Sequence, residues 1–271
     1  MSLEDVARRG LVLLGCGKMG SAMLAGWLGR GLPPASVRVI EPAPSDWLRG
    51  TGVVLDGPLP PAPAIAVIAV KPQAMAAALP ALAPLGGGET LFLSIAAGTP
   101  LAALEAVLGA GSPIIRAMPN TPAAVGRGIS AIIGNRHAGD AHLRLAEELL
   151  GAVGQVVRLE SEEQMDAVTG LSGSGPAYVF HLIECLAEAG AAEGLAPDLA
   201  MRLAKATVAG AGALAEAAGE SPAQLRVNVT SPGGTTQAGL AVLMDPETGL
   251  PPLIRKTVAA ATRRSRELRD G

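Results

Sequence analysis

The first 160 residues alternate short, nearly continuous apolar runs with longer segments of mixed character. The runs have the length and β-branched content of strands that helices cover on both faces, as in a parallel sheet. They lie at 11–15, 37–41, 64–70, 90–95, 113–118 and 153–159. Segments of helical length lie between them, at 18–30, 72–83, 100–108 and 138–150. This alternation predicts a doubly wound, Rossmann-type α/β domain over residues 1–160.

The strand pattern ends at about residue 161. From there, Gly and Pro residues separate apolar segments that predict helices over 176–194, 197–218, 234–244 and 251–268. The segment 197–218 is rich in small residues and short of Lys and Glu, so we expect its surface to be covered, with another subunit as one candidate. The sequence thus predicts an all-α second domain over residues 161–271.

Composition excludes several classes of protein. Hydrophobic residues make up 49% of the chain, yet no apolar run approaches the roughly 18 residues that a membrane span needs. The first residues lack the order of a signal peptide, so we expect a cytoplasmic protein. The two cysteines are far apart and no histidine cluster has ligand spacing, so we expect no metal site.

A basic cluster near the C-terminal end is the one feature that could bind a polyanion. Because its cations alternate with apolar and acidic residues and the net charge of the chain is −3, we interpret it as a solvated helix face and expect no nucleic-acid partner. Its members are Arg255, Lys256, Arg263, Arg264, Arg266 and Arg269.

A dinucleotide fingerprint, GCGKMG, follows the first predicted strand and opens a helix, which is the context that gives this motif its meaning. The first glycine permits a tight turn, the second lets a pyrophosphate approach the backbone, and the third allows close helix–strand packing. The expected coenzyme contacts are Gly15, Cys16, Gly17, Lys18, Met19 and Gly20.

Glu41 ends the second predicted strand, where an acid can accept hydrogen bonds from the adenosine ribose and repel the 2′-phosphate of NADP. Taken alone it favours NAD(H); the alternative is that it points to solvent. The turns after the next strands should also line the coenzyme, because ligands of such sheets sit beyond the carboxyl ends of the strands. They supply Ala69, Val70, Lys71, Pro72, Ile95, Ala96, Ala97 and Asn120. For Lys71 the sequence leaves three roles open: a contact to a coenzyme phosphate, a charge on the surface, or a catalytic group.

Two stretches of the second half stand out. The sequence GSGP at 173–176 is explained equally well by helix initiation, as a flexible turn with a hydroxyl cap, and by function. TSPGGTT at 230–236 places four hydroxyls and two glycines at the start of a predicted helix. The unpaired N–H groups of such a terminus form an anion site, suited to a carboxylate. The expected substrate contacts are Ser231, Gly233, Gly234, Thr235 and Thr236.

These motifs, together with AVKPQ, SIAAG, RAMPNTP and DAVTGLSGSGPAYVF, occur in the order and spacing of the pyrroline-5-carboxylate reductase family, which the chain resembles from about Leu11 to Leu268. The resemblance implies reduction of 1-pyrroline-5-carboxylate to L-proline by NADPH or NADH, the last step of proline biosynthesis. It also implies a homodimer formed through the helical domain, and in some members an assembly of such dimers into a decamer.

Carried over by motif, the resemblance implies that Thr236 hydrogen-bonds the ring nitrogen of the substrate as the catalytic hydroxyl, and that the 231–235 loop holds its carboxylate. Asn228 and the two turns at 69–72 and 95–97 would touch the coenzyme. Family members often prefer NADPH and have hydroxyl or basic residues after the second strand, whereas this chain has Glu41, so its coenzyme preference stays open.

Two alternatives remain at this point. A β-hydroxyacid dehydrogenase would begin with a similar fingerprint, but it needs a basic lysine in the first long helix of its second domain, and the stretch GSGPAYVFHLIE contains none. A nonenzymatic protein that senses NAD(P)H would share the coenzyme domain. Such a sensor would not require the hydroxyl and glycine loop at 230–236.

Overall fold

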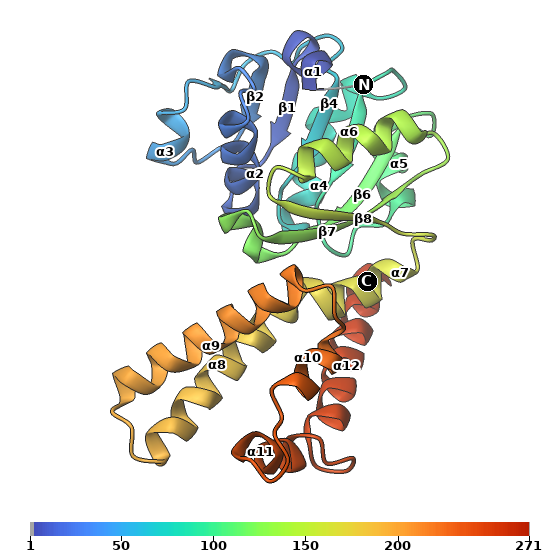
Figure 1. Cartoon of the computed structure of the whole chain (residues 1–271). Coiled ribbons are helices and arrows are strands. Elements are labelled where there is room, and N and C mark those ends of the chain that lie inside the picture. Colours follow the sequence, from blue (N-terminus) through green and yellow to red (C-terminus); the bar gives the residue numbers. More distant parts are fainter. Residues whose placement is uncertain (1–2, 271) are drawn as a thin grey trace. The chain divides into compact units, whose positions relative to one another are not determined.

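The structure is a computed structural model that describes residues 3–270 (Figure 1). It divides into two compact units: Met1–Gly173 with Ala261–Gly271, and Ser174–Ala260. The last helix, α12 (Leu250–Asp270), therefore begins in the second unit and ends in the first. The predicted division lies between residues 160 and 161, ahead of the one between Gly173 and Ser174, and it assigns all of this helix to the second domain.

The first unit contains one sheet of eight strands in the order β3-β2-β1-β4-β5-β6-β7-β8. All neighbouring strands are parallel except β6 and β7. The strands are β1 (Leu11–Leu14), β2 (Val37–Ile40), β3 (Val54–Leu55), β4 (Ile65–Ile68), β5 (Leu91–Ser94), β6 (Ile114–Met118), β7 (Gly128–Gly134) and β8 (Gly154–Arg158). The predicted Rossmann-type doubly wound sheet is confirmed.

Side chains that alternate along the strands build a core on each face of the sheet. On one face, Leu11 and Leu13 pack with residues of α2 (Lys18–Gly29) and α6 (Asp140–Leu150). On the other, Val12 and Leu14 pack with residues of α4 (Met75–Ala78) and α5 (Leu101–Leu108). Because the central strands are covered on both sides, their sequences read as uninterrupted apolar runs.

Three features of this unit differ from the sequence-based expectation. The segment predicted as one helix over 72–83 is a 3₁₀ turn, the short α4 and a second 3₁₀ stretch, Leu79–Leu85, since prolines within it remove backbone donors. Strands β3 and β7 were not predicted. Strand β7 is antiparallel to β6 because only a short 3₁₀ turn, Thr121–Val125, and a left-handed Gly126 connect the two strands. Two further short helices are α1 (Leu3–Arg9) and α3 (Asp46–Arg49).

The segment around GSGP is helical throughout rather than a flexible turn. Helix α7 (Gln164–Val168) continues as a π-helical turn, Thr169–Gly173, directly into α8 (Gly175–Ala192). Ser174 has helical dihedral angles and makes no capping hydrogen bond through its hydroxyl. The hydroxyl cap expected there was wrong; Pro176 does lie in the first turn of α8, as expected.

Every regular element described between residues 174 and 260 is a helix, which confirms the all-α second part. Besides α8 these are α9 (Pro197–Ala217), α10 (Pro222–Asn228), α11 (Thr235–Leu243) and the first part of α12. Helices α8 and α9 lie side by side (Figure 1). Ala187, Ala200 and Ala204 are buried at this seam, where small side chains let the helices approach closely. No helix in the described residues is long and apolar enough to cross a bilayer.

Candidate active site

The turn after β1 can form only with glycine at its first position. Gly15 has a φ of +87°, and a Cβ atom there would lie 2.8 Å from Val70 Cγ1 and 2.9 Å from the carbonyl oxygen of Ala69. A Cβ atom on Gly20 would lie 2.7 Å from the carbonyl oxygen of Gly15. The two glycines therefore let the first turn of α2 pack tightly against the ends of β1 and β4.

Gly17 has a different part in the same turn. It is the N-cap of α2, and a Cβ atom on it would meet no other atom within 4 Å, so the space beyond it is open. The first backbone N–H groups of α2 have no partner within the helix and lie at its positive end. Such a terminus binds a pyrophosphate, so the turn fits the dinucleotide that its sequence predicts.

A cavity of about 490 Å³ lies where β1, β4, β5 and β6 end. Most of the predicted coenzyme residues line it: Gly17, Lys18, Met19, Ala69, Val70, Lys71, Pro72, Ile95, Ala96 and Ala97. Two further residues, Met118 and Pro119, also line it and were not predicted; their place directly after a buried strand was the signal that could have found them. The lining is largely apolar, which suits a flat aromatic ring.

Glu41 turns back onto the glycine turn instead of pointing to solvent. Its Oε2 atom accepts a hydrogen bond of 2.8 Å from the backbone N–H of Cys16, and its Oε1 atom accepts one of 3.1 Å from Ala43. The carboxylate is thus held beside the fingerprint. Burial, followed by the nearby Glu41 charge, raises the pKa of the Cys16 thiol to about 11, so this thiol is protonated at neutral pH.

The two predicted asparagines lie outside the lining of this cavity. Asn120 donates through Nδ2 to the carbonyl oxygen of Ser172 at 3.2 Å and accepts from the backbone of Ile129 at 2.9 Å, so it joins three segments of the first unit. Asn228 lies in α10 of the second unit, hydrogen-bonded to Glu220 and Gln224. Their predicted coenzyme contacts stay predictions.

The loop at 230–236 forms the helix start that its sequence predicts. Helix α11 begins at Thr235 with Gly234 as its N-cap, and Gly233, with a φ of +71°, makes the turn before it. The Gly233 N–H donates to Oε1 of Gln237 at 2.6 Å. Ser231, Thr235 and Thr236 are exposed, so their hydroxyls and the first amides of α11 face open solvent in the isolated chain.

Among the described residues, no group of three or more His, Cys, Asp or Glu side chains could hold a metal ion.

A pyrroline-5-carboxylate reductase of Pseudomonas aeruginosa is 40% identical to this chain over 266 residues, which cover 96% of the chain and 97% of the relative. One from Synechocystis is 42% identical over 268 residues, covering 95% and 97%. The chain belongs to the pyrroline-5-carboxylate reductase family. Residues 162–268 match the family model for pyrroline-5-carboxylate reductase dimerisation.

Solved structures of the reductase family share the fold over nearly the whole chain. The pyrroline-5-carboxylate reductase of Coxiella burnetii superposes with a TM-score of 0.90 at 34% identity, covering 96% of this chain and 98% of that one. The Plasmodium falciparum enzyme, solved with NADP bound, has a TM-score of 0.82 at 28% identity and covers 96% and 98%. The resemblance stated from the motifs is confirmed, and the match to the dimerisation model shows that the reductase self-associates.

Proposed function

We propose that this protein reduces 1-pyrroline-5-carboxylate to L-proline with NAD(P)H, the last step of proline biosynthesis. Reductases of this name align with the chain from end to end at 38 to 42% identity, and this observation carries the proposal. A nonenzymatic sensor or a β-hydroxyacid dehydrogenase would not account for that similarity. The fold supplies the two parts that the reaction needs, a dinucleotide cavity in the first unit and an anion-binding helix start in the second.

The residues of the first unit fit the coenzyme. The amides at the start of α2 would hold the pyrophosphate, the Glu41 carboxylate would accept hydrogen bonds from the ribose, and Ile95, Ala96 and Ala97 would border the nicotinamide. Lys71, exposed at the mouth of the cavity, is placed to contact a phosphate. The reduced nicotinamide supplies a hydride.

The helix start at 230–236 would hold the substrate. Its carboxylate would rest on the first amides of α11, from Thr235 on, where the helix dipole favours negative charge, with the Ser231 hydroxyl beside it. The predicted contacts with Gly233 and Gly234 would require their N–H groups to leave the Gln237 side chain and the carbonyl oxygen of Ser231, to which they donate. The Thr236 hydroxyl would hydrogen-bond the ring nitrogen and so fix the face of the ring that is reduced. Asn228, close in sequence to this loop, would contact the coenzyme.

The reaction needs little acid–base help from the protein. In the protonated imine the carbon is already electrophilic; when the hydride adds to it, the π electrons of the C=N bond become the lone pair of the amine nitrogen. The nitrogen keeps its proton, and proline takes up a further one from solvent or through the Thr236 hydroxyl. Positioning therefore supplies most of the catalysis that the chain itself contributes.

The first test is oxidation of reduced nicotinamide by purified protein with 1-pyrroline-5-carboxylate, followed by absorbance. Thr236→Ala should lower kcat/KM by about tenfold to a hundredfold, the loss of one hydrogen bond to a charged group. Thr236→Ser keeps the hydroxyl and should retain most of the activity. No oxidation by folded wild-type protein with either coenzyme would contradict the reductase proposal. Equal losses in the Ala and Ser variants would contradict the assignment of the Thr236 hydroxyl.

The finer proposal is that NADH is preferred over NADPH. Glu41 is held by Cys16 and Ala43 at the place where the adenosine ribose binds in this fold, and the residues that follow it, 42–48, contain Asp46 but no Lys or Arg. A 2′-phosphate there would meet a fixed negative charge, and the first cation that follows along the chain is the exposed Arg49 in the last turn of α3. Loss of the Glu41 charge should therefore relax the preference.

Coenzyme choice is measured as the ratio of kcat/KM for NADH to that for NADPH. The wild-type ratio should exceed one, and Glu41→Gln should lower it by about tenfold, mainly by improving NADPH. Asp46→Asn, which removes a nearby exposed acid, is the matched control and should change the ratio little. A wild-type preference for NADPH, or an unchanged ratio in Glu41→Gln, would contradict this proposal and leave the reductase assignment intact.

Two further elements of the proposal concern assembly and location. The family's dimerisation region supports a homodimer as the working unit, and the assembly of such dimers into a decamer, implied by the sequence resemblance, is a finer proposal that sedimentation at defined concentration would test. We propose that the enzyme works in the cytoplasm.

A further inference from the structure

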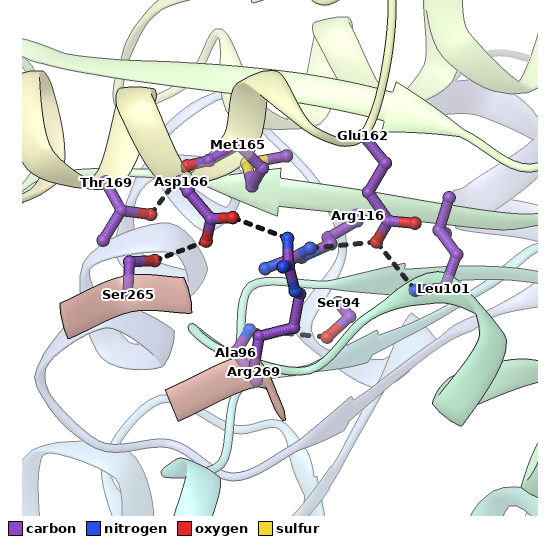
Figure 2. Close-up of polar contacts among 10 residues, drawn as sticks. All are labelled: Ser94, Ala96, Leu101, Arg116, Glu162, Met165, Asp166, Thr169, Ser265 and Arg269. Carbon is purple, nitrogen blue, oxygen red and sulfur yellow. Dashed lines mark hydrogen bonds and ion pairs between the residues drawn. The ribbon is translucent and has the colours of Figure 1, made fainter. Parts of the chain in front are cut away.

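A buried polar cluster, separate from the glycine turn, lies where α7 meets the end of α12 (Figure 2). Its centre is Asp166, whose side chain is 2% exposed. One carboxylate oxygen accepts a hydrogen bond of 2.7 Å from the Ser265 hydroxyl, and the other pairs with Nη1 of Arg269 at 2.7 Å. We refer to Asp166, Ser265 and Arg269 as the clasp.

The clasp contains Arg269, the member of the C-terminal basic cluster that turns away from solvent. The sequence predicts a solvated face, and Arg263, Arg264 and Arg266 are indeed exposed. Arg269 instead turns inward to a carboxylate that water does not reach. Removal of Arg269 would leave the buried Asp166 carboxylate without its compensating charge, so breaking this pair costs more than breaking a fully exposed one.

Glu162, in the loop before α7, hydrogen-bonds to β6 and to the start of α5. Glu162 accepts hydrogen bonds through Oε1 from Nη1 of the buried Arg116, at 2.9 Å, and from the backbone N–H of Leu101, at 2.8 Å (Figure 2). Leu101 begins α5, whose N-cap Pro100 supplies no side-chain acceptor, so Glu162 provides it. Glu162 thus connects the loop before α7 to β6 and α5, and Asp166 connects α7 to the end of α12.

Between these anchors lies the segment 95–100, which we call the coenzyme turn because Ile95, Ala96 and Ala97 line the cavity. The end of α12 lies close to this turn: a Cβ atom built on Gly98 would just meet the carbonyl oxygen of Leu268, at 3.4 Å, so the space between them is about as wide as one side-chain carbon. Leu268 directly precedes Arg269 of the clasp. The position of the last turn of α12 therefore limits how far the coenzyme turn can move outward.

We propose that Arg269 is a positioning residue for coenzyme binding: through Asp166 it holds the end of α12 beside Gly98, and this close neighbour limits the coenzyme turn to its binding geometry. The inference rests on the proposed function in that the cavity takes NAD(P)H. Arg269 acts without touching the reacting atoms, because its guanidinium is engaged by Asp166 and the residue beside the turn is the neighbouring Leu268.

The test measures the affinity of the free enzyme for reduced coenzyme, by fluorescence titration without substrate, alongside steady-state kinetics and thermal unfolding. Arg269→Ala should raise the Kd and KM for coenzyme by about tenfold, as expected when a positioning contact is loosened. The KM for 1-pyrroline-5-carboxylate should stay within about twofold, because the substrate loop lies in the other unit. Arg269→Lys keeps a cation and should recover part of the affinity.

Arg266→Ala is the matched control, since it removes the same charge from an exposed position of the same helix and should leave the coenzyme Kd unchanged. If Arg269→Ala does not fold, Ser265→Ala removes one clasp hydrogen bond while keeping the ion pair, and should raise the Kd by about twofold to fivefold. An unchanged coenzyme Kd in the folded Arg269 or Ser265 variant, even with a lowered melting temperature, would overturn the proposal, since the clasp would then be structural only.

The two proposals fail in different ways. If wild-type protein binds reduced coenzyme but does not oxidise it with 1-pyrroline-5-carboxylate, the reductase assignment fails and the clasp is still judged by the Kd values. If turnover is normal and the Arg269→Ala variant binds coenzyme as the wild type does, only the clasp proposal fails.

Discussion

Gly15 and Gly17 stand two residues apart in the same turn, and the structure requires glycine only at the first. At Gly15 the backbone has a positive φ, and a Cβ atom would lie only 2.8 Å from Val70 and 2.9 Å from the carbonyl oxygen of Ala69, so the fold itself excludes a side chain. At Gly17 φ is −70° and a Cβ atom would meet no protein atom within 4 Å, so we expect the need for glycine there to come from the coenzyme. Stability and coenzyme affinity should therefore separate between the two positions.

Gly15→Ala should lower the free energy of unfolding by about 1–3 kcal/mol, through backbone strain and the close contacts. Gly17→Ala should leave that free energy within about 0.5 kcal/mol of the wild type, and raise the coenzyme Kd by about tenfold or more, because its methyl group occupies the approach of the pyrophosphate. Denaturant unfolding and fluorescence titration of the two variants make the comparison. A destabilised Gly17→Ala protein with normal coenzyme affinity would contradict this division.

Most residues that line the cavity could be predicted from the sequence because they directly follow buried strands. The direction of the Glu41 side chain could not, since the choice between solvent and the glycine turn depends on a tertiary hydrogen bond to Cys16. The inward direction of the Arg269 side chain could not be predicted from the sequence for a similar reason. Its partner Asp166 is 103 residues away, and no local pattern distinguishes it from the other cations of the cluster.

At the scale of elements, helix α6 and strand β8 are joined by a group of surface charges. Arg158 of β8 pairs with Glu147 at 2.5 Å and with Asp140 at 2.7 Å. The hydrogen bond from Arg158 lowers the pKa of the Glu147 carboxyl below its ordinary value of 4.5. A carboxyl whose folded pKa is lowered stabilises the fold above its unfolded pKa, and this contribution is lost as the pH falls through the folded value.

Glu147→Gln should therefore flatten the pH dependence of stability. The free energy of unfolding of the wild type should fall as the pH drops from about 5 to 3, and the variant should lose less over the same interval. At pH 7 the variant should be slightly less stable, and high salt should narrow the difference, because the pair is largely exposed. Glu148→Gln on the same helix is the control, expected to keep the wild-type dependence in urea titrations at each pH. Parallel curves for wild type and Glu147→Gln would disprove the assignment.

Most strands of the sheet could be predicted because burial on both faces makes their sequences uniformly apolar. Strand β7 lacks this uniformly apolar sequence, because GISAIIG begins and ends in glycine and contains a serine. Its antiparallel direction follows from the shortness of the turn that precedes it. The broken helix at 72–85 was misread because propensity favoured Ala and Leu there, while Pro80 and Pro84 decided the outcome. The π-helical turn at 169–173 has no sequence signal that distinguishes it from a loop rich in Gly and Ser.

At the scale of the whole molecule, the helical unit leaves much apolar surface uncovered in a single chain. On α8 and α9 the exposed large side chains include Phe180, Leu182, Leu199 and Leu203. Many exposed apolar side chains on two neighbouring helices indicate an interaction surface, and residues 162–268 match the family's dimerisation region. The small residues predicted to need a cover, at 197–218, belong to the same surface.

Phe180→Asp and Leu203→Asp, at side chains 57% and 49% exposed in the single chain, should weaken self-association by about thirtyfold or more, the loss of a central contact of about 2 kcal/mol. Val125→Asp is the control, because Val125 is 75% exposed but lies in the first unit. Sedimentation or light scattering over a dilution series gives the association constants. Unaltered association in both helical variants would place the interface elsewhere.

The uncovered face of α8 and α9 also affects how heat resistance is measured. If subunits must meet before this surface is protected, unfolding is coupled to dissociation, and mass action raises the melting temperature as the protein is concentrated. A single transition temperature then describes a solution of stated concentration and not the polypeptide by itself. Comparison of variants is meaningful only at matched molarity, and a mutation that merely loosens the pairing of subunits would be mistaken for damage to the fold.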